Sequence, residues 1–318
     1  MSFLYYLPAR RTLNFDLKFN NMKSYFLFFG LLLSLCTGHG QSYDKLSVMS
    51  SPGVTTYFSK GFDQRARQIA TRVENVIGYY YNLINFKPSV SLLILSKADW
   101  SDHTKFPVYG MPHYTNNATL IVAAEDNEFW RSFLSLEDLP EETLRRVKQI
   151  YGRRDSSVSM QAFFDLLAIH ELGHAFHSQG KLQMQRKWMG ELFCNILLHT
   201  YIAEKEPEQL PALTLFPKIV VSGGAKNYKY TSLQQLEENY NEIGQQHPQN
   251  YGWYQCRWHV AAGAIYDTNG KNAFQRLWST LQTEQVKLTD TALAELLENK
   301  VGKSVADMML RWEKDIIR

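Results

Sequence analysis

The chain has little cysteine and, after its first 40 residues, no long apolar run. Three cysteines in 318 residues are too few for a disulfide scaffold. No segment beyond Gln41 approaches the roughly 20 consecutive apolar residues that a membrane-spanning helix needs. The sequence also lacks internal repeats and low-complexity tracts. With 45% hydrophobic and 14% aromatic residues, the chain is instead expected to bury a full core.

An excess of one charge is also missing from most of the sequence. The formal net charge of +3 arises in the first 40 residues, where Arg10, Arg11, Lys18 and Lys23 outnumber Asp16. The remainder carries 30 basic and 30 acidic residues. A balanced body gives no electrostatic basis for nucleic-acid binding, so we expect no nucleic-acid partner.

The N-terminal segment is typical of an export signal. From Met22, the sequence "MKSYFLFFGLLLSLCTGHGQ" has one lysine, an apolar core and then small residues. This pattern predicts a translation start at Met22, with an upstream extension before it and cleavage before Gln41. Residues 1–40 would then be extension and signal, and residues 41–318 one domain.

A lipid anchor is less consistent with this segment. The stretch "LSLC" at 33–36 is similar to a bacterial lipoprotein box, but Leu35 occupies the place where such boxes need a small residue. We therefore expect an exported protein, secreted or periplasmic, rather than one anchored in the membrane through its N-terminal segment.

The apolar spacing predicts an α+β chain: a small N-terminal mixed sheet with one long helix, a motif-bearing helix, and a mostly helical C-terminal half. Predicted strands cover 54–61, 90–96 and 118–124. Predicted helices cover 63–86, 141–151, a motif-bearing segment that ends at Gly180, about 187–204, and most of 251–318. Pro88 is expected to stop the first of these helices, and Gly180 is expected to act as a C-terminal cap of the motif-bearing helix. Residues 205–250 are interpreted as a lid or substrate-facing insertion, with a hairpin at 214–224 and a helix opened by Thr231 and Gln234.

The stretch "AIHELGHAFHSQG", residues 168–180, carries the clearest chemical motif. HExxH places His170 and His174 one turn apart on one helical face, the spacing that grips a single zinc ion, with Glu171 in reach of a water on the metal. A third ligand is expected at Glu191, in "KWMGELFCN", with Glu204 as the alternative. The third histidine of the stretch, at position 177, is expected to be a solvated neighbour.

HELGH followed by a glutamate on the next helix resembles the gluzincin division of zinc metallopeptidases, of which thermolysin is the best known, and more widely the peptidase MA-like families. The likeness covers most of residues 54–317, but only the HExxH and glutamate elements are specific. The resemblance implies a zincin-like fold in which the strand at 118–124 is an edge strand that pairs with extended substrate. Two departures stand out: a shorter gap to the glutamate, and Asn195 where several gluzincins have an acidic residue. Asn195 can still accept a hydrogen bond from a ligand imidazole.

The same resemblance implies an exported zinc-dependent metallopeptidase that holds one zinc ion per chain and hydrolyses peptide bonds of a peptide or protein substrate. Glu171 would act as general base toward the zinc-activated water. By the family pattern Tyr254 would donate to the developing oxyanion, with Tyr251 and His247 as alternatives.

Two other functions remain open from the sequence. One is a secreted, zinc-stabilised binding or scaffold protein of zincin fold without catalysis, although a purely structural site has no use for a base such as Glu171. The other is a zinc hydrolase of a non-peptide bond. The pairing of Cys194 and Cys256 is also open, since an exported protein meets conditions in which they could form a disulfide or remain buried thiols.

Overall fold

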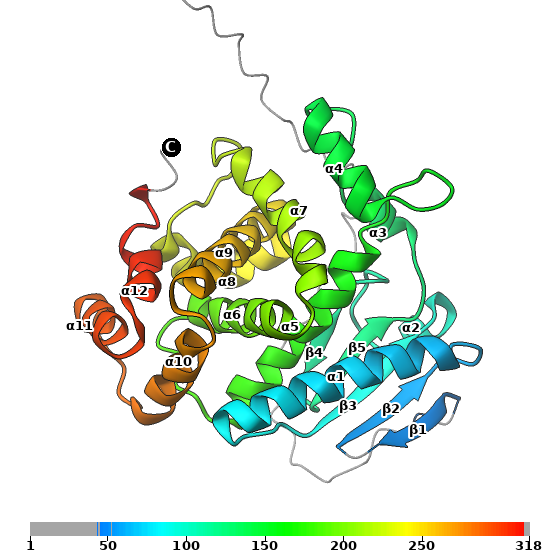
Figure 1. Cartoon of the computed structure of the whole chain (residues 1–318), viewed down its shortest axis with the longest axis horizontal. Coiled ribbons are helices and arrows are strands. Elements are labelled where there is room, and N and C mark those ends of the chain that lie inside the picture. Colours follow the sequence, from blue (N-terminus) through cyan, green and yellow to red (C-terminus); the bar gives the residue numbers. More distant parts are fainter. Residues whose placement is uncertain (1–42, 44, 52, 315–318) are drawn as a thin grey trace, which may run out of the picture.

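The computed structural model describes residue 43 and residues 45–51 and 53–314 (Figure 1). The predicted export signal and its cleavage before Gln41 lie outside the described residues. The prediction of a small mixed sheet followed by a mostly helical half is confirmed. In the described part of the chain, no helix is long and apolar enough to cross a bilayer.

Five strands form one mixed sheet in the order β1-β2-β3-β5-β4. Their bounds are β1 Ser47–Ser51, β2 Val54–Phe58, β3 Val90–Leu95, β4 His113–Thr115 and β5 Thr119–Ala123. β2, β3 and β5 are parallel, and β1 and β4 are antiparallel to their neighbours. Leu93 stands opposite both Tyr57 and Ile121. β3 and β5 read as continuous apolar runs because both faces of a central parallel strand are buried.

The expected edge strand is an interior strand. β5, which covers most of the predicted 118–124 strand, lies between β3 and β4, so β4 forms that edge of the sheet. β4 has only three residues and follows a loop rich in proline and glycine, which gives it no alternating pattern to detect.

The twelve α-helices of the described residues are mostly in the second half of the chain. Their bounds are α1 Asp63–Ile84, α2 Lys97–His103, α3 Glu128–Ser132, α4 Glu141–Tyr151, α5 Gln161–Gln179, α6 Lys187–Lys205, α7 Leu210–Ser222, α8 Leu233–Gln246, α9 Pro248–Asn269, α10 Asn272–Thr283, α11 Asp290–Leu296 and α12 Lys303–Leu310. A 3-10 turn, η1 (Pro207–Gln209), precedes α7, and a π-helical turn, η2 (Leu297–Val301), precedes α12.

α1 lies along the sheet and buries one apolar stripe that includes Val73, Val76 and Tyr80 (Figure 1). It ends at Asn85, which adopts the left-handed conformation with a φ of 52°. The helix therefore stops three residues before Pro88, the predicted terminator, through a left-handed C-terminal cap.

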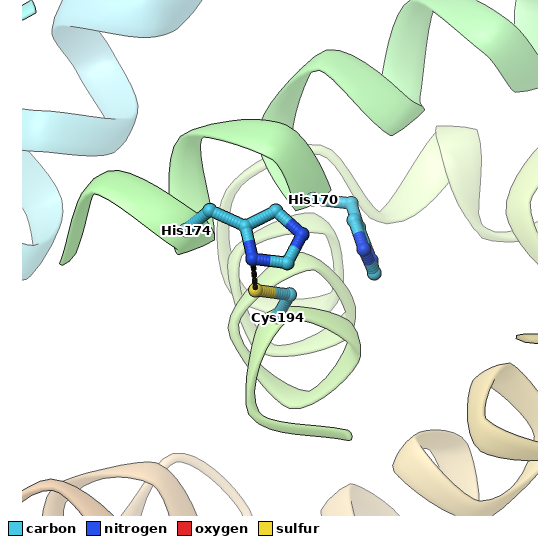
Figure 2. Close-up of side chains that lie close together, drawn as sticks. All are labelled: His170, His174 and Cys194. Carbon is cyan, nitrogen blue, oxygen red and sulfur yellow. Dashed lines mark hydrogen bonds between the residues drawn. The ribbon is translucent and has the colours of Figure 1, made fainter. Parts of the chain in front are cut away.

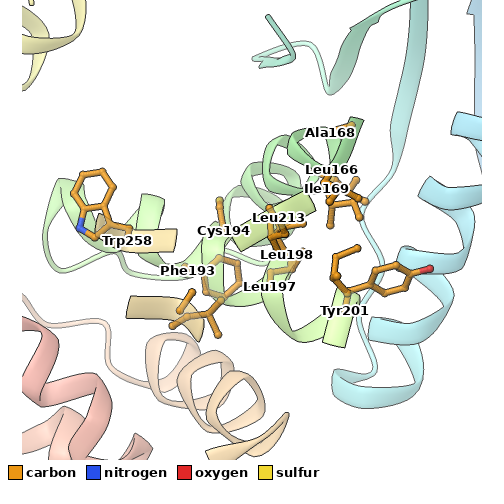
Figure 3. Close-up of a cluster of buried hydrophobic side chains, with 14 of the residues drawn as sticks. Leu166, Ala168, Ile169, Phe193, Cys194, Leu197, Leu198, Tyr201, Leu213 and Trp258 are labelled. Atoms are coloured by element: carbon orange, nitrogen blue, oxygen red, sulfur yellow. The ribbon is translucent and has the colours of Figure 1, made fainter. Parts of the chain in front are cut away.

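α6 is the central helix of the helical half. Its residues from Trp188 to Ile202 are buried without interruption, as expected of a helix that is packed on all sides. It packs against both α5 and α9. Figure 3 shows the resulting core, in which Ile169 of α5 and Leu213 of α7 lie with Leu197 and Leu198 of α6.

Residues 205–250 differ locally from the predictions. The predicted hairpin at 214–224 is wrong, because α7 occupies this segment and packs against α9. Its apolar residues recur at helical steps, and their burial against α9 stabilises the helix. The helix contains Pro217 without a break. The next helix opens one residue later than predicted, with a capping box formed by Ser232 and Gln235.

Gly180 ends α5, but not through a left-handed conformation. Its φ is −71°, and the following Lys181 takes the positive φ of 53°. A Cβ at position 180 would collide with the ring of Trp278. The glycine is therefore required by packing between α5 and α10 rather than by backbone conformation.

Candidate metal centre

A close approach of α5 and α6 builds the site. Gly173, inside the HELGH motif, faces α6: a Cβ there would lie 2.9 Å from Cys194 Sγ and 3.0 Å from Cys194 Cα. No other residue leaves this space free. Because the helices come this close, Glu191 on α6 reaches the two histidines on α5.

Glu191 lies close to both predicted histidine ligands. His170 Nε2 is 3.2 Å and His174 Nε2 is 3.9 Å from Glu191 Oε2. Donor atoms that share a tetrahedral zinc ion lie about 3.4 Å apart, given bonds of about 2.0–2.1 Å. Both distances to Glu191 are therefore near the spacing that a shared zinc ion requires. His170 and Glu191 are buried, whereas His174 is partly exposed.

Cys194 forms a second donor set with the same histidines. Ligand atoms of His170, His174 and Cys194 all lie within 4.8 Å of one another (Figure 2). Cys194 Sγ is 3.5 Å from His174 Nδ1, whereas Glu191 approaches His174 through Nε2. The two sets thus use different nitrogens of one imidazole.

The charge states of the two donors favour Glu191. Burial alone would raise its pKa, but the hydrogen bond with His170 and the nearby His174 outweigh burial and hold the pKa well below its usual range. Burial, together with Glu191 and Glu171, raises the pKa of the Cys194 thiol well above its usual value. A metal binds deprotonated donors, so the ionised carboxylate can bind without losing a proton, whereas the thiol must first lose one.

Two side chains that the sequence did not reveal hold the Glu191 carboxylate. The hydroxyl of Tyr240 donates to Oε1 at 2.7 Å, and Gln255 Nε2 donates to Oε2 at 2.7 Å. Gln255 Nε2 also donates a hydrogen bond to the hydroxyl of Tyr251 at 2.9 Å. Tyr240 follows a kink in α8 at Asn239, whose backbone is non-helical. Neither residue belongs to a motif, and only the interpretation of 205–250 as substrate-facing pointed toward Tyr240.

Asn195 joins the hydrogen-bonded network of Glu191 through Gln255 and through the backbone of α6. Its Nδ2 donates to the Glu191 backbone oxygen at 3.0 Å and to Gln255 Oε1 at 3.3 Å. Asn195 Oδ1 and His170 Nδ1 are both buried and make no hydrogen bond in the described part of the chain. Burial lowers the pKa of His170, but the hydrogen bond with Glu191 and the charges of Glu171 and Glu191 raise it above its usual value. The predicted hydrogen bond from a ligand imidazole to Asn195 Oδ1 is not formed.

His177 is not the solvated neighbour that we expected. Its Nε2 lies 3.0 Å from His174 Nδ1. Burial, with a contribution from His174, lowers the pKa of His177 to about 4, so the ring is neutral near pH 7. The neutral ring can accept a hydrogen bond from the Nδ1–H group of His174. That tautomer leaves the lone pair of His174 Nε2 free for a metal.

Glu171, the predicted base, contacts the sheet edge. Its Oε2 accepts a hydrogen bond from the backbone N–H of Tyr114 at 3.2 Å, and it lies 4.0 Å from His174 Nε2. Tyr114 is the middle residue of β4. The short edge strand therefore borders the metal centre.

Tyr254 is not brought to this cluster. Its hydroxyl donates to the Ser232 backbone oxygen at 2.7 Å, and its ring stacks on Trp312 with centroids 5.8 Å apart. The alternative donor Tyr251, nearly one turn earlier on α9, reaches the Glu191 network through Gln255.

Other predicted residues also lie elsewhere. His247 pairs with Glu242 at 3.5 Å. Glu204 accepts a hydrogen bond from Tyr266 at 2.9 Å and is separated from Glu191 by 13 positions of one helix, about 20 Å at 1.5 Å per residue. Glu204 is therefore too far away to replace Glu191.

The two cysteines of the described residues, Cys194 and Cys256, are free and buried, so they do not form a disulfide. Comparison with known proteins found no matching protein-family model and no significant similarity to a curated protein.

Proposed function

We propose that the chain is an exported, zinc-dependent metallopeptidase of gluzincin type, with residues 41–318 as a single zincin-like domain. The observation that carries the proposal is the proximity of Glu191 to both His170 and His174, with Glu171 beside His174. Two imidazoles and one carboxylate leave a coordination place for water, as catalytic zinc sites require.

The donor chemistry of the site fits zinc. The carboxylate of Glu191 is ionised and accepts hydrogen bonds from Tyr240 and Gln255. The neutral ring of His177 lies beside His174 Nδ1, the nitrogen that does not approach Glu191. Such supported ligands are typical of bound zinc. His170, His174 and Glu191 would hold the zinc ion, which would supply a Lewis acid able to lower the pKa of water and polarise a carbonyl group.

The chain's own residues supply the remaining functions. Glu171 is partly exposed and can take a proton from water and return it to a leaving amine. β4 pairs with β5 on one side only among the described strands, so an extended peptide would pair along its other edge, where the backbone N–H of Tyr114 now donates to Glu171. In place of Tyr254, we assign the oxyanion donor to Tyr251, because Tyr251 belongs to the hydrogen-bonded network of Glu191.

A combined metal and digestion experiment tests the proposal. Purified protein is analysed for zinc and then incubated with a broad peptide library, with and without a chelator. We expect about one zinc ion per chain and chelator-sensitive cleavage of peptide bonds. Zinc without any cleavage would favour the binding or scaffold protein, and hydrolysis restricted to ester or amide model compounds would favour a non-peptide substrate.

A further inference from the structure

A cavity of about 400 Å³ lies between α6, α7 and α9, and none of the metal-centre residues lines it. Its apolar walls include Leu210, Pro217 and Val260. The rest of the lining includes two buried histidines and two exposed residues of opposite charge. Its volume falls in the range of small-molecule sites, which begins at about 300 Å³.

Two histidines of the lining make no hydrogen bond with a described residue. His199 is 6% exposed and packs against the ring of Tyr266, and His259 is 7% exposed and packs against the rings of Phe163 and His170. Burial lowers the pKa of His199, so this ring is neutral near pH 7. The cavity therefore presents two imidazole groups that are free to hydrogen-bond an occupant.

The charged pair lies near the same imidazoles. Asp267 and Lys218 are both exposed, and neither forms an ion pair within the described residues. Their charges act on His199 in opposite directions: Asp267 raises its pKa and Lys218 lowers it, both less than burial does. The cavity thus combines a cation, an anion, an apolar wall and two imidazoles.

We propose that this cavity binds a free amino acid with a hydroxylated aromatic side chain, the chemistry of L-tyrosine. The carboxylate pairs with Lys218 and the ammonium group with Asp267. The ring packs against the apolar wall, and the hydroxyl group bonds to the imidazoles of His199 and His259. A zwitterion matches both exposed charges at once, which a simple carboxylate or amine does not. The cavity adjoins the metal centre through His259, whose ring centroid lies 6.3 Å from that of His170, but its occupancy does not require the proposed peptidase activity.

Calorimetric titration of the whole protein with L-tyrosine tests this inference. Three analogues each lack one group: L-phenylalanine lacks the hydroxyl, tyramine the carboxylate, and 3-(4-hydroxyphenyl)propionate the ammonium. We expect saturable binding of one L-tyrosine per chain, with each analogue about three- to ten-fold weaker, the worth of one hydrogen bond or ion pair. Absence of saturable binding would leave the cavity to water and overturn the proposal.

Matched variants locate the binding. Lys218→Met and Asp267→Asn change exposed side chains and should weaken binding by about three- to ten-fold. Lys226→Met and Asp138→Asn, which are exposed elsewhere, should leave it unchanged. His199→Phe should also weaken binding, and if that variant does not fold, the two surface variants still decide the question. Equal binding by the Lys218 and Asp267 variants and their controls would refute the assignment.

Discussion

The hydroxyl of Tyr240 donates a hydrogen bond to Glu191 Oε1 at 2.7 Å, across 49 positions of sequence. This contact ties α8 to the third metal ligand and fixes the orientation of a buried carboxylate. Burial and the neighbouring Glu191 raise the pKa of Tyr240, so its hydroxyl remains a donor throughout the physiological range. Removal of that donor should therefore weaken zinc binding.

Tyr240→Phe should weaken zinc affinity by about ten-fold, because partners of metal ligands contribute at that level. Competition with a chromophoric chelator measures the affinity. Tyr254→Phe is the matched control, since it also loses a buried tyrosine hydrogen bond, but one made to the Ser232 backbone. It should lower the free energy of unfolding by about 1 kcal/mol and leave zinc affinity unchanged. Equal zinc affinity in wild type and Tyr240→Phe would contradict the role given to this contact.

The identity of the third ligand separates the two donor sets. Glu191→Gln should lose zinc affinity, whereas Cys194→Ser should keep it, because the thiol is protonated and adjoins the other nitrogen of His174. Substitution with Co²⁺ provides a second readout, since a thiolate ligand gives an intense charge-transfer band that carboxylate and imidazole do not. Such a band in wild type, lost in Cys194→Ser, would assign the metal to the cysteine set instead.

Glu171→Gln keeps the size of the side chain and should leave zinc content unchanged. It removes the proton acceptor, so turnover should fall by about 100- to 10,000-fold. Peptide hydrolysis is measured together with zinc content of the same sample. Cleavage at the wild-type rate would rule out Glu171 as the general base.

Gly173→Ala introduces a Cβ into the contact between α5 and α6. Because that atom would lie 2.9 Å from Cys194 Sγ and 3.0 Å from Cys194 Cα, the helices must separate. We expect unfolding to become easier by about 1–3 kcal/mol, and zinc affinity to fall. Gly244→Ala in α8 is the control, since no atom lies within 4 Å of a Cβ there, and it should stabilise by about 0.4–1 kcal/mol. Denaturant titration compares them, and equal stability of the two variants would refute the packing argument.

The sequence alone determined what depends on neighbours along the chain. The predicted helix at 141–151 is α4, and the predicted strands at 54–61, 90–96 and 118–124 contain β2, β3 and β5. HExxH spacing likewise places two imidazoles and the carboxylate of Glu171 within one turn of a helix, whatever the rest of the chain does. These features follow from the periods of the helix and the strand, which a few consecutive residues reveal.

Tertiary structure decided everything that depends on distant segments. It made β4 the sheet edge, gave Glu191 its hydrogen bonds from Tyr240 and Gln255, and turned Tyr254 toward Ser232. Gln255 lies 64 positions from Glu191. Such pairs form because packing of α6 against α8 and α9 buries a carboxylate that must then be satisfied, and buried polar groups take the partners that the packed helices supply.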